Sequence, residues 1–188
     1  MLYELIIAGF GGQGVLSMGR ILAQAALAEG KHVSWLPSYG PEMRGGTANC
    51  NVVIADEEVS NPIVSQASAA IIMNKPSLEK FEDSVASNGV LIINSSLIDT
   101  ESRRDDIKVY YVQANAIAEG LGNSKVANMV MLGAFLAVTP VVTIESLEQV
   151  IEESFSGSKA SIADINKQAL AAGCASMNLT LSRFPIII

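Results

Sequence analysis

The amino-acid sequence predicts an α/β protein with a mostly parallel sheet and helices on both faces. Through the first two-thirds of the chain, short apolar segments typical of strands alternate with segments whose apolar residues recur at helical spacing. The final third shows only the helical pattern. Of the 188 residues, 49% are hydrophobic and 16% are charged, which is typical of a globular protein with a large core.

The first elements are predicted within residues 2–55. Residues 2–8 are an apolar run that is typical of a buried strand. Residues 12–29 place their apolar side chains along one helical face. Residues 32–36 predict the second strand. Residues 47–55 predict the third, because they alternate in polarity and are rich in Val and Ile.

The middle of the chain continues the same alternation. Residues 69–73 predict a strand, and residues 77–87 an amphipathic helix that ends at the Asn88-Gly89 pair. Two further strands are expected at residues 90–94 and 107–112, after which no strand pattern remains. The order of strands and helices is Rossmann-like.

The last third is expected to be helical. Residues 115–121 predict a short helix, and Ser124 is the expected N-cap of a longer one over residues 125–138. Thr143 is the expected cap of the next helix, and residues 160–172 predict the last. We find no internal repeat or linker, so residues 1–188 are expected to form a single domain.

Charge and hydropathy exclude several classes of partner. The net charge of −7 argues against a nucleic-acid surface, which needs clustered Lys and Arg, and against capture by an anionic membrane. The apolar run over residues 126–142 contains Asn128 and Pro140, so it predicts a buried helix and not a membrane span. No pattern of a secretory signal is present at the start of the sequence, and we expect a cytoplasmic location.

Residues 9–14 (Gly-Phe-Gly-Gly-Gln-Gly) fit the pattern GxGxxG between a predicted strand and a predicted helix. Such a turn lets the backbone approach a ligand, and the free N–H groups of the helix start attract an anion. A dinucleotide site also needs an acidic residue after the second strand, but no acid occurs there before Glu42. A stand-alone nucleotide-binding enzyme is therefore the weaker alternative. Another alternative is that these glycines serve only the geometry of the turn and close packing, without any ligand.

Residues 38–46 (Ser-Tyr-Gly-Pro-Glu-Met-Arg-Gly-Gly) predict a second shaped loop at the end of the second strand. Arg44 offers a planar set of donors suited to a carboxylate or a phosphate. In open α/β sheets ligands bind at the carboxyl ends of the strands, where both loops are expected.

Other residues with chemical potential do not assemble into a catalytic set. Cys50 and Cys174 are far apart and lack any CxxC pattern, so they are expected to be buried thiols and not cluster ligands. His32 is expected at the end of a strand. Asn128 lies in an apolar helix and needs hydrogen-bond partners, so we expect it to brace the glycine loops, with a ligand contact as the alternative. We assign no catalytic residue and no metal ligand.

Three stretches make the chain resemble the gamma subunit of 2-oxoacid:ferredoxin oxidoreductases: residues 9–14, 38–50 and 128–134. The resemblance extends over residues 3–174 and leaves residues 175–188 outside it. Within the family it is strongest for the separate gamma chain (C subunit) of 2-oxoglutarate:ferredoxin oxidoreductases. The branched-chain 2-oxoacid and pyruvate enzymes are close alternatives.

This resemblance implies oxidative decarboxylation of a 2-oxoacid to its acyl-CoA, with electrons passed to ferredoxin. Thiamine diphosphate, Mg²⁺ and [4Fe–4S] clusters are then expected on partner alpha and beta subunits, with a delta subunit as an alternative cluster carrier. This chain is expected to bind no cofactor alone, to be inactive in isolation, and to shape the coenzyme A side of the site. The residues implied for that surface are Gly11, Gly12, Gln13, Gly14, Tyr39, Arg44, Gly45 and Gly46. A scaffold subunit without ligand contacts is the alternative.

Overall fold

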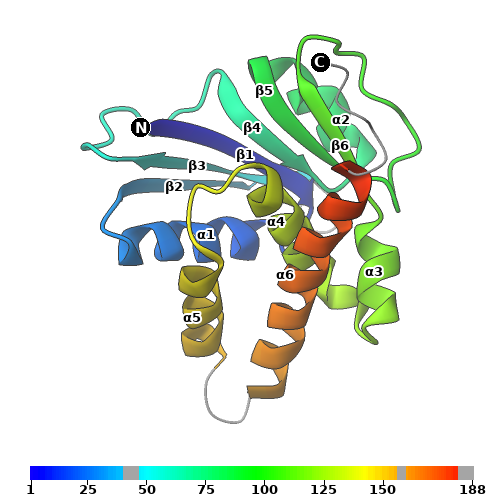
Figure 1. The fold of residues 1–188 in the computed structure, drawn as a ribbon. Coiled ribbons are helices and arrows are strands. Elements are labelled where there is room, and N and C mark those ends of the chain that lie inside the picture. The colour runs from blue at the N-terminus through cyan, green and yellow to red at the C-terminus, as the bar shows by residue number, and fades with distance from the viewer. Residues whose placement is uncertain (40–46, 156–159, 182–188) are drawn as a thin grey trace.

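A computed structural model describes the backbone of residues 1–39, 47–155 and 160–181, and their side chains except those of residues 39 and 178–181. A single six-stranded sheet has the order β2-β3-β1-β4-β5-β6 (Figure 1). The strands are β1 (Leu2–Phe10), β2 (His32–Tyr39), β3 (Thr47–Ala55), β4 (Ala67–Ile72), β5 (Val85–Asn94) and β6 (Lys108–Val112).

The sheet is mostly parallel, as the sequence predicts. The pairs β1–β4, β4–β5 and β5–β6 are parallel, whereas β3 is antiparallel to both β1 and β2. Only residues 40–46 connect β2 to β3, which is too short for the crossover that a parallel pair would need. The reversed direction of β3 therefore follows from the length of that connection.

Helices cover both faces of the sheet, which confirms the expected architecture. On one face lie α1 (Val15–Ala28), α4 (Ala127–Val138), α5 (Ile144–Ser154) and α6 (Ala160–Leu181), with α3 (Ala114–Gly120) beside α4 (Figure 1). On the other face lies α2 (Lys75–Phe81), followed by the short 3₁₀ helix η1 (Glu82–Ser84). Another short 3₁₀ helix, η2 (Ser124–Val126), leads into α4.

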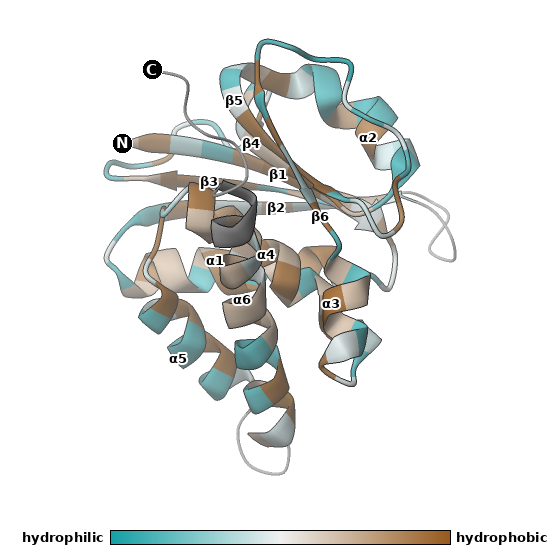
Figure 2. Ribbon diagram, turned by 45° about the vertical axis from the view of Figure 1, so that its right-hand side comes forward, coloured by the Kyte–Doolittle hydropathy of each residue, from teal (hydrophilic) through white to brown (hydrophobic). Residues whose placement is uncertain are grey.

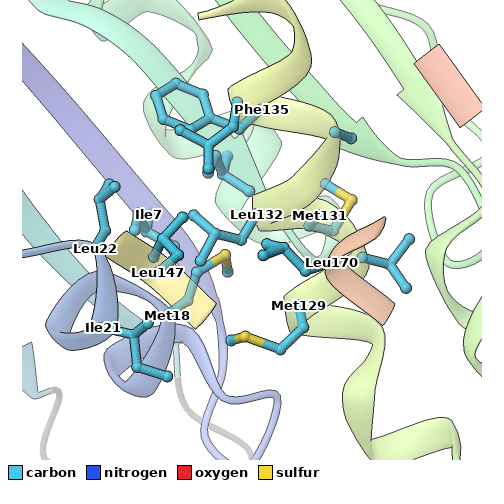
Figure 3. Close-up of a cluster of buried hydrophobic side chains, with 14 of the residues drawn as sticks. Ile7, Met18, Ile21, Leu22, Met129, Met131, Leu132, Phe135, Leu147 and Leu170 are labelled. Atoms are coloured by element: carbon cyan, nitrogen blue, oxygen red, sulfur yellow. The ribbon is translucent and has the colours of Figure 1, made fainter. Parts of the chain in front are cut away.

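The strands alternate between two hydrophobic clusters, one on each face. In β1, Leu5 and Ile7 face the larger helical layer, while Ile6 and Ala8 face the side of α2. Figure 2 shows the resulting pattern, with hydrophobic central strands and hydrophilic residues along the outer helix α5. In the larger cluster, Met18 of α1 and Leu147 of α5 lie beside Leu132 of α4 (Figure 3).

Helix α4 is buried between the sheet and α6. Its residues from Ala127 to Leu136 are all buried, which confirms the expected core helix. A Cβ at Gly133 would overlap the carbonyl of Leu170 in α6, so the two helix backbones approach closely there. Among the described residues, no helix combines the length and the apolar character that crossing a bilayer requires.

The predicted helix over residues 77–87 is wrong at its end. α2 ends at Phe81, and β5 begins at Val85. The Asn88-Gly89 pair lies within β5, where the pairing with β4 shifts register, and Asn88 has a φ of 65°. The pair therefore marks a bulge in a strand and not the end of a helix.

Other boundaries also differ from the sequence-based expectation. Ser124 is not the N-cap of the long helix, because α4 begins at Ala127 after Val126, which makes no side-chain cap. The Asn123 side chain caps η2 instead, by accepting a hydrogen bond from the Lys125 N–H at 3.0 Å. β2 continues through Pro37 to Tyr39, because an edge strand tolerates a missing N–H donor. α6 continues beyond residue 172 to Leu181. The predicted cap at Thr143 is confirmed by its bond from the Ser146 N–H.

Candidate functional site

The glycine turn (residues 9–14) lies at the carboxyl edge of the sheet, next to the end of β2. Phe10 of β1 pairs with Thr47 of β3, and Tyr39 of β2 pairs with Ala48. The ends of β1 and β2 are therefore separated only by the first residues of β3. This edge is the usual ligand-binding edge of an open α/β sheet.

Positive backbone angles require glycine at two positions of this turn. Gly12 has a φ of 94° and Gly14 a φ of 74°. Gly14 is the N-cap of α1, and its carbonyl accepts the first helical hydrogen bond from the Met18 N–H at 2.9 Å. The chain thus changes from strand to helix within a few residues, because glycine adopts left-handed angles without a steric penalty.

The glycines differ in how much space surrounds them. A Cβ at Gly9 would lie 2.7 Å from the Oε1 atom of Gln13 and 2.7 Å from the Cβ of Met73. A Cβ at Gly14 would overlap the side chain of Asn128. At Gly12, in contrast, no atom lies within 4 Å of the added carbon. Packing thus explains the glycines at positions 9 and 14, whereas position 12 is open to a ligand.

Two amide side chains hold the glycine turn. The Gln13 Oε1 accepts a hydrogen bond from the Phe10 N–H at 2.6 Å, and its Nε2 donates to the Met73 carbonyl at 3.2 Å. From α4, the Asn128 Nδ2 donates to the Gly14 carbonyl at 3.3 Å. The prediction that Asn128 braces a glycine loop is confirmed.

At the start of α1, two exposed N–H donors make no hydrogen bond to the described residues, and no acid lies in the first turn of the helix. Gly11 and Gly12 are exposed, and neither N–H donates to another of the described residues. The first turn of α1 contains no acidic residue. A helix of 14 residues with free N–H groups at its start attracts an anion such as a phosphate.

The structure brings five of the predicted site residues to one edge. Gly11, Gly12, Gln13 and Gly14 form the turn, and Tyr39 is the last residue of β2. The other three, Arg44, Gly45 and Gly46, lie outside the described residues.

The two thiols are free and contact different parts of the fold. Cys50 in β3 is fully buried, its Sγ donates to the Val15 carbonyl at 3.7 Å, and burial raises the pKa of this thiol to about 12. Cys174 in α6 is only partly buried and donates to the Gly133 carbonyl at 3.1 Å. In the part of the chain that the structure describes, no three His, Cys, Asp or Glu side chains gather as a metal site.

The profile of one protein family, described as pyruvate ferredoxin/flavodoxin oxidoreductase, matches residues 4–176. The chain belongs to this family. The turn, α1 and α4 all lie within the match, so the geometry above is that of a member of the pyruvate ferredoxin/flavodoxin oxidoreductase family.

Curated relatives from this family include subunits of enzymes for different 2-oxoacids. The chain is 44% identical to the ketoisovalerate oxidoreductase subunit VorA of Methanothermobacter thermautotrophicus over 89% of its own length, but it spans only 35% of that relative. It is 36% identical to the 2-oxoglutarate synthase subunit KorC of Methanocaldococcus jannaschii over 80% of its length and 82% of KorC.

Two solved structures have a similar fold. The gamma subunit of a keto/oxoacid ferredoxin oxidoreductase from Geobacter sulfurreducens has a TM-score of 0.81 at 28% identity, over 94% of this chain and 99% of that one. A 2-oxoglutarate:ferredoxin oxidoreductase from Magnetococcus marinus has a TM-score of 0.87 at 20% identity, over 95% of this chain and 31% of that one. The resemblance of this family member to gamma subunits, expected from its sequence, is confirmed.

The sequence did not predict that Met73 contributes a hydrogen bond to the site. Its backbone carbonyl accepts from Gln13, and its own N–H donates to the Ala8 carbonyl at 2.8 Å. A backbone carbonyl leaves no signal in the residue type. The amide of Gln13 was the available signal, because a side chain with both a donor and an acceptor suits a link between two strands.

Proposed function

We propose that this chain is the gamma-type subunit of a 2-oxoacid:ferredoxin oxidoreductase and shapes the coenzyme A side of its active site. The complex would oxidise and decarboxylate a 2-oxoacid, form its acyl-CoA and pass the electrons to ferredoxin. The observation that supports this role most directly is the exposed glycine turn at the start of α1, in a member of the pyruvate ferredoxin/flavodoxin oxidoreductase family.

Coenzyme A suits this turn because it brings phosphate groups. The N–H groups of Gly11 and Gly12 and the positive end of the α1 dipole would interact with a phosphate. Arg44 would add bidentate donors from the 38–46 loop, and Tyr39, Gly45 and Gly46 would complete the surface. The Magnetococcus marinus structure of similar fold contains bound coenzyme A and succinyl-CoA.

The redox cofactors are assigned to other chains. The sequence has two cysteines, whereas a [4Fe–4S] cluster needs four thiolates. Thiamine diphosphate, Mg²⁺ and the clusters would therefore belong to alpha and beta subunits, or to a delta subunit, and ferredoxin would dock on the assembled complex. The relative VorA is nearly three times as long as the region that this chain matches. This length is consistent with cofactor sites that lie on other segments or chains.

Two substrates are candidates. The sequence motifs favour 2-oxoglutarate, whereas the identity is 44% to the ketoisovalerate subunit VorA and 36% to the 2-oxoglutarate subunit KorC. Turnover of the assembled complex with 2-oxoglutarate, pyruvate and branched-chain 2-oxoacids would decide between them.

The test of the coenzyme A contact is a pair of substitutions at the open position. Gly12→Asp and Gly12→Asn have nearly the same shape, and both side chains tolerate a positive φ. In the assembled complex, the aspartate should raise the KM for coenzyme A about tenfold or more above the asparagine variant, through repulsion of the phosphates. The KM for the 2-oxoacid should be the same in both. Equal values for coenzyme A would contradict the proposal.

A scaffold subunit without ligand contacts predicts a different result for the arginine. Under the proposed function, Arg44→Ala weakens the dependence of acyl-CoA formation on coenzyme A, and Arg44→Lys does so less, since an ammonium lacks the bidentate geometry. A scaffold would show changed subunit association only, which size-exclusion chromatography of the complex would detect.

A further inference from the structure

The side chain of Gln13 is engaged inside the protein and not directed to a ligand. Its Oε1 accepts from the Phe10 N–H at 2.6 Å, and its Nε2 donates to the Met73 carbonyl at 3.2 Å. Phe10 ends β1, and Met73 directly follows β4. One amide thus joins the ends of two neighbouring strands at the edge where the glycine turn begins.

Asn128 holds the other end of the turn. It is only 7% exposed, and its Nδ2 donates to the Gly14 carbonyl at 3.3 Å. The same carbonyl accepts from the Met18 N–H, so the first helical bond of α1 and the contact from α4 meet at one atom. The side chain also occupies the space where a Cβ of residue 14 would lie.

Two backbone donors of the turn take no part in these bonds. The Gln13 N–H donates to the Phe10 carbonyl at 3.2 Å, whereas the N–H groups of Gly11 and Gly12 have no acceptor among the described residues. Both of these glycines are exposed. The inner atoms of the turn are therefore held by amides, and the N–H groups of Gly11 and Gly12 make no hydrogen bond within the described part of the chain.

We propose that Gln13 and Asn128 are positioning residues, which hold the Gly11–Gly12 donors in the arrangement that an anion needs and do not touch the ligand themselves. The inference rests on the proposed function, and it changes the role expected for the Gln13 side chain from ligand contact to support. Donors that are held in place before the ligand arrives bind it more tightly, because less ordering remains to be done.

Gln13→Met tests the first of the two contacts. Methionine has a similar length and brings no charge to the turn, but it cannot donate to the Met73 carbonyl and is only a weak acceptor for the Phe10 N–H. In the assembled complex we expect the KM for coenzyme A to rise about tenfold, from the loss of these part-buried hydrogen bonds, with kcat within about twofold of wild type. The KM for the 2-oxoacid should not change.

Gln24→Met is the matched control. Gln24 lies on the exposed face of α1, so its substitution makes the same exchange of side chains without altering the turn. It should leave every kinetic constant at the wild-type value. An equal rise of the KM for coenzyme A in both variants would overturn the proposal, because an exchange outside the turn would then have the same effect.

Asn128→Ser tests the second contact, with Asn166→Ser as its control. Asn166 is also 7% exposed and also donates to a backbone carbonyl, that of Ile162 at 2.6 Å, but it lies within α6. Both variants should lose similar stability, and only Asn128→Ser should raise the KM for coenzyme A. A wild-type KM in Asn128→Ser, or an equal rise in Asn166→Ser, would overturn the role of Asn128.

The Gly12 pair separates failure of this inference from failure of the proposed function. If Gly12→Asp impairs coenzyme A binding relative to Gly12→Asn but neither amide variant does, the anion site stands and the positioning role is overturned. If Gly12→Asp has no specific effect, the site and its positioning residues are overturned together.

Discussion

Gly12 and Gly14 lie in the same turn and both have positive φ, yet they tolerate a side chain differently. Gly14→Ala adds a Cβ that overlaps Asn128, in addition to the left-handed angle, and should lower the free energy of unfolding by roughly 2–4 kcal/mol. Gly12→Ala meets no atom within 4 Å and should lower it by only about 1 kcal/mol. Urea unfolding of the two variants measures the difference.

A double variant identifies the source of that difference. In a protein that already contains Asn128→Ala, the overlap at position 14 is removed, so adding Gly14→Ala should then lower stability by about as much as Gly12→Ala does. An unchanged penalty would mean that backbone strain alone explains the glycine.

Glu82 is a buried carboxylate with several donors around it. It is 2% exposed, and it accepts from the Ser102 Oγ at 2.6 Å, the Arg103 N–H at 2.7 Å and the Arg103 Nε at 2.8 Å. Burial raises the pKa of this carboxyl, but the hydrogen bonds from Ser102 and Arg103 outweigh burial and hold the pKa below its usual value.

This lowered pKa makes a prediction about pH. The contribution of Glu82 to stability should be complete above the unfolded-state pKa of about 4.3 and should disappear as the pH falls through the lower folded-state pKa. Glu82→Gln should therefore destabilise the protein at pH 7, by on the order of 1–3 kcal/mol, and the gap from wild type should narrow below about pH 4. Unfolding at several pH values tests this. Glu58→Gln, at an exposed position, should leave the free energy of unfolding at pH 7 close to that of wild type.

Helices α1 and α5 are joined through a single cap. The Thr143 Oγ1 accepts from the Ser146 N–H at 3.2 Å, and Thr143 donates from both its N–H, at 2.6 Å, and its hydroxyl, at 2.8 Å, to Glu29 at the end of α1. Thr143→Ala should lower the free energy of unfolding by about 1–2 kcal/mol, whereas Thr143→Ser keeps the hydroxyl and most of the stability. Thermal unfolding of both variants provides the comparison, and equal losses would contradict a capping role.

The contact between α4 and α6 depends on glycine at the crossing. A Cβ at Gly133 would overlap the Leu170 carbonyl, and one at Gly173 would overlap the Val130 carbonyl. Since backbone atoms cannot rotate away, Gly133→Ala should lower the free energy of unfolding by roughly 2–4 kcal/mol, although alanine is the better helix former. Gly120→Ala in α3, where no atom lies within 4 Å of the added carbon, should be neutral or stabilising. Chemical unfolding of the two variants checks this order.

The assembled complex is the unit in which activity is expected. The purified chain alone should show no oxidation of a 2-oxoacid, because the thiamine and iron–sulfur chemistry is assigned to partner subunits. Addition of those subunits should restore acyl-CoA formation, which is measured through the reduction of ferredoxin or a dye. Steady turnover by the isolated chain would contradict this division of function.

The strands were the most predictable part of the molecule. All six were expected near their observed places, because each contains a short apolar run. The helix over residues 77–87 failed, since a bulge at Asn88 has the same residue types as a helix end. The antiparallel direction of β3 was also not expected, because the short 40–46 connection requires it only once β2 and β3 are known to pair with each other.

The features of the candidate site also fall into two groups, those that the sequence predicts and those that only the fold determines. Local residue types were sufficient to expect the glycine turn, its place after β1 and the need of Asn128 for a partner, since positive φ, helix starts and buried amides depend on nearby atoms or on burial alone. The contacts of Gln13 with Met73 and of Asn128 with Gly14 join residues 60 and 114 positions apart, and chain folding alone brings them together. Short-range preferences therefore specified what the turn is made of, and long-range packing specified what holds it.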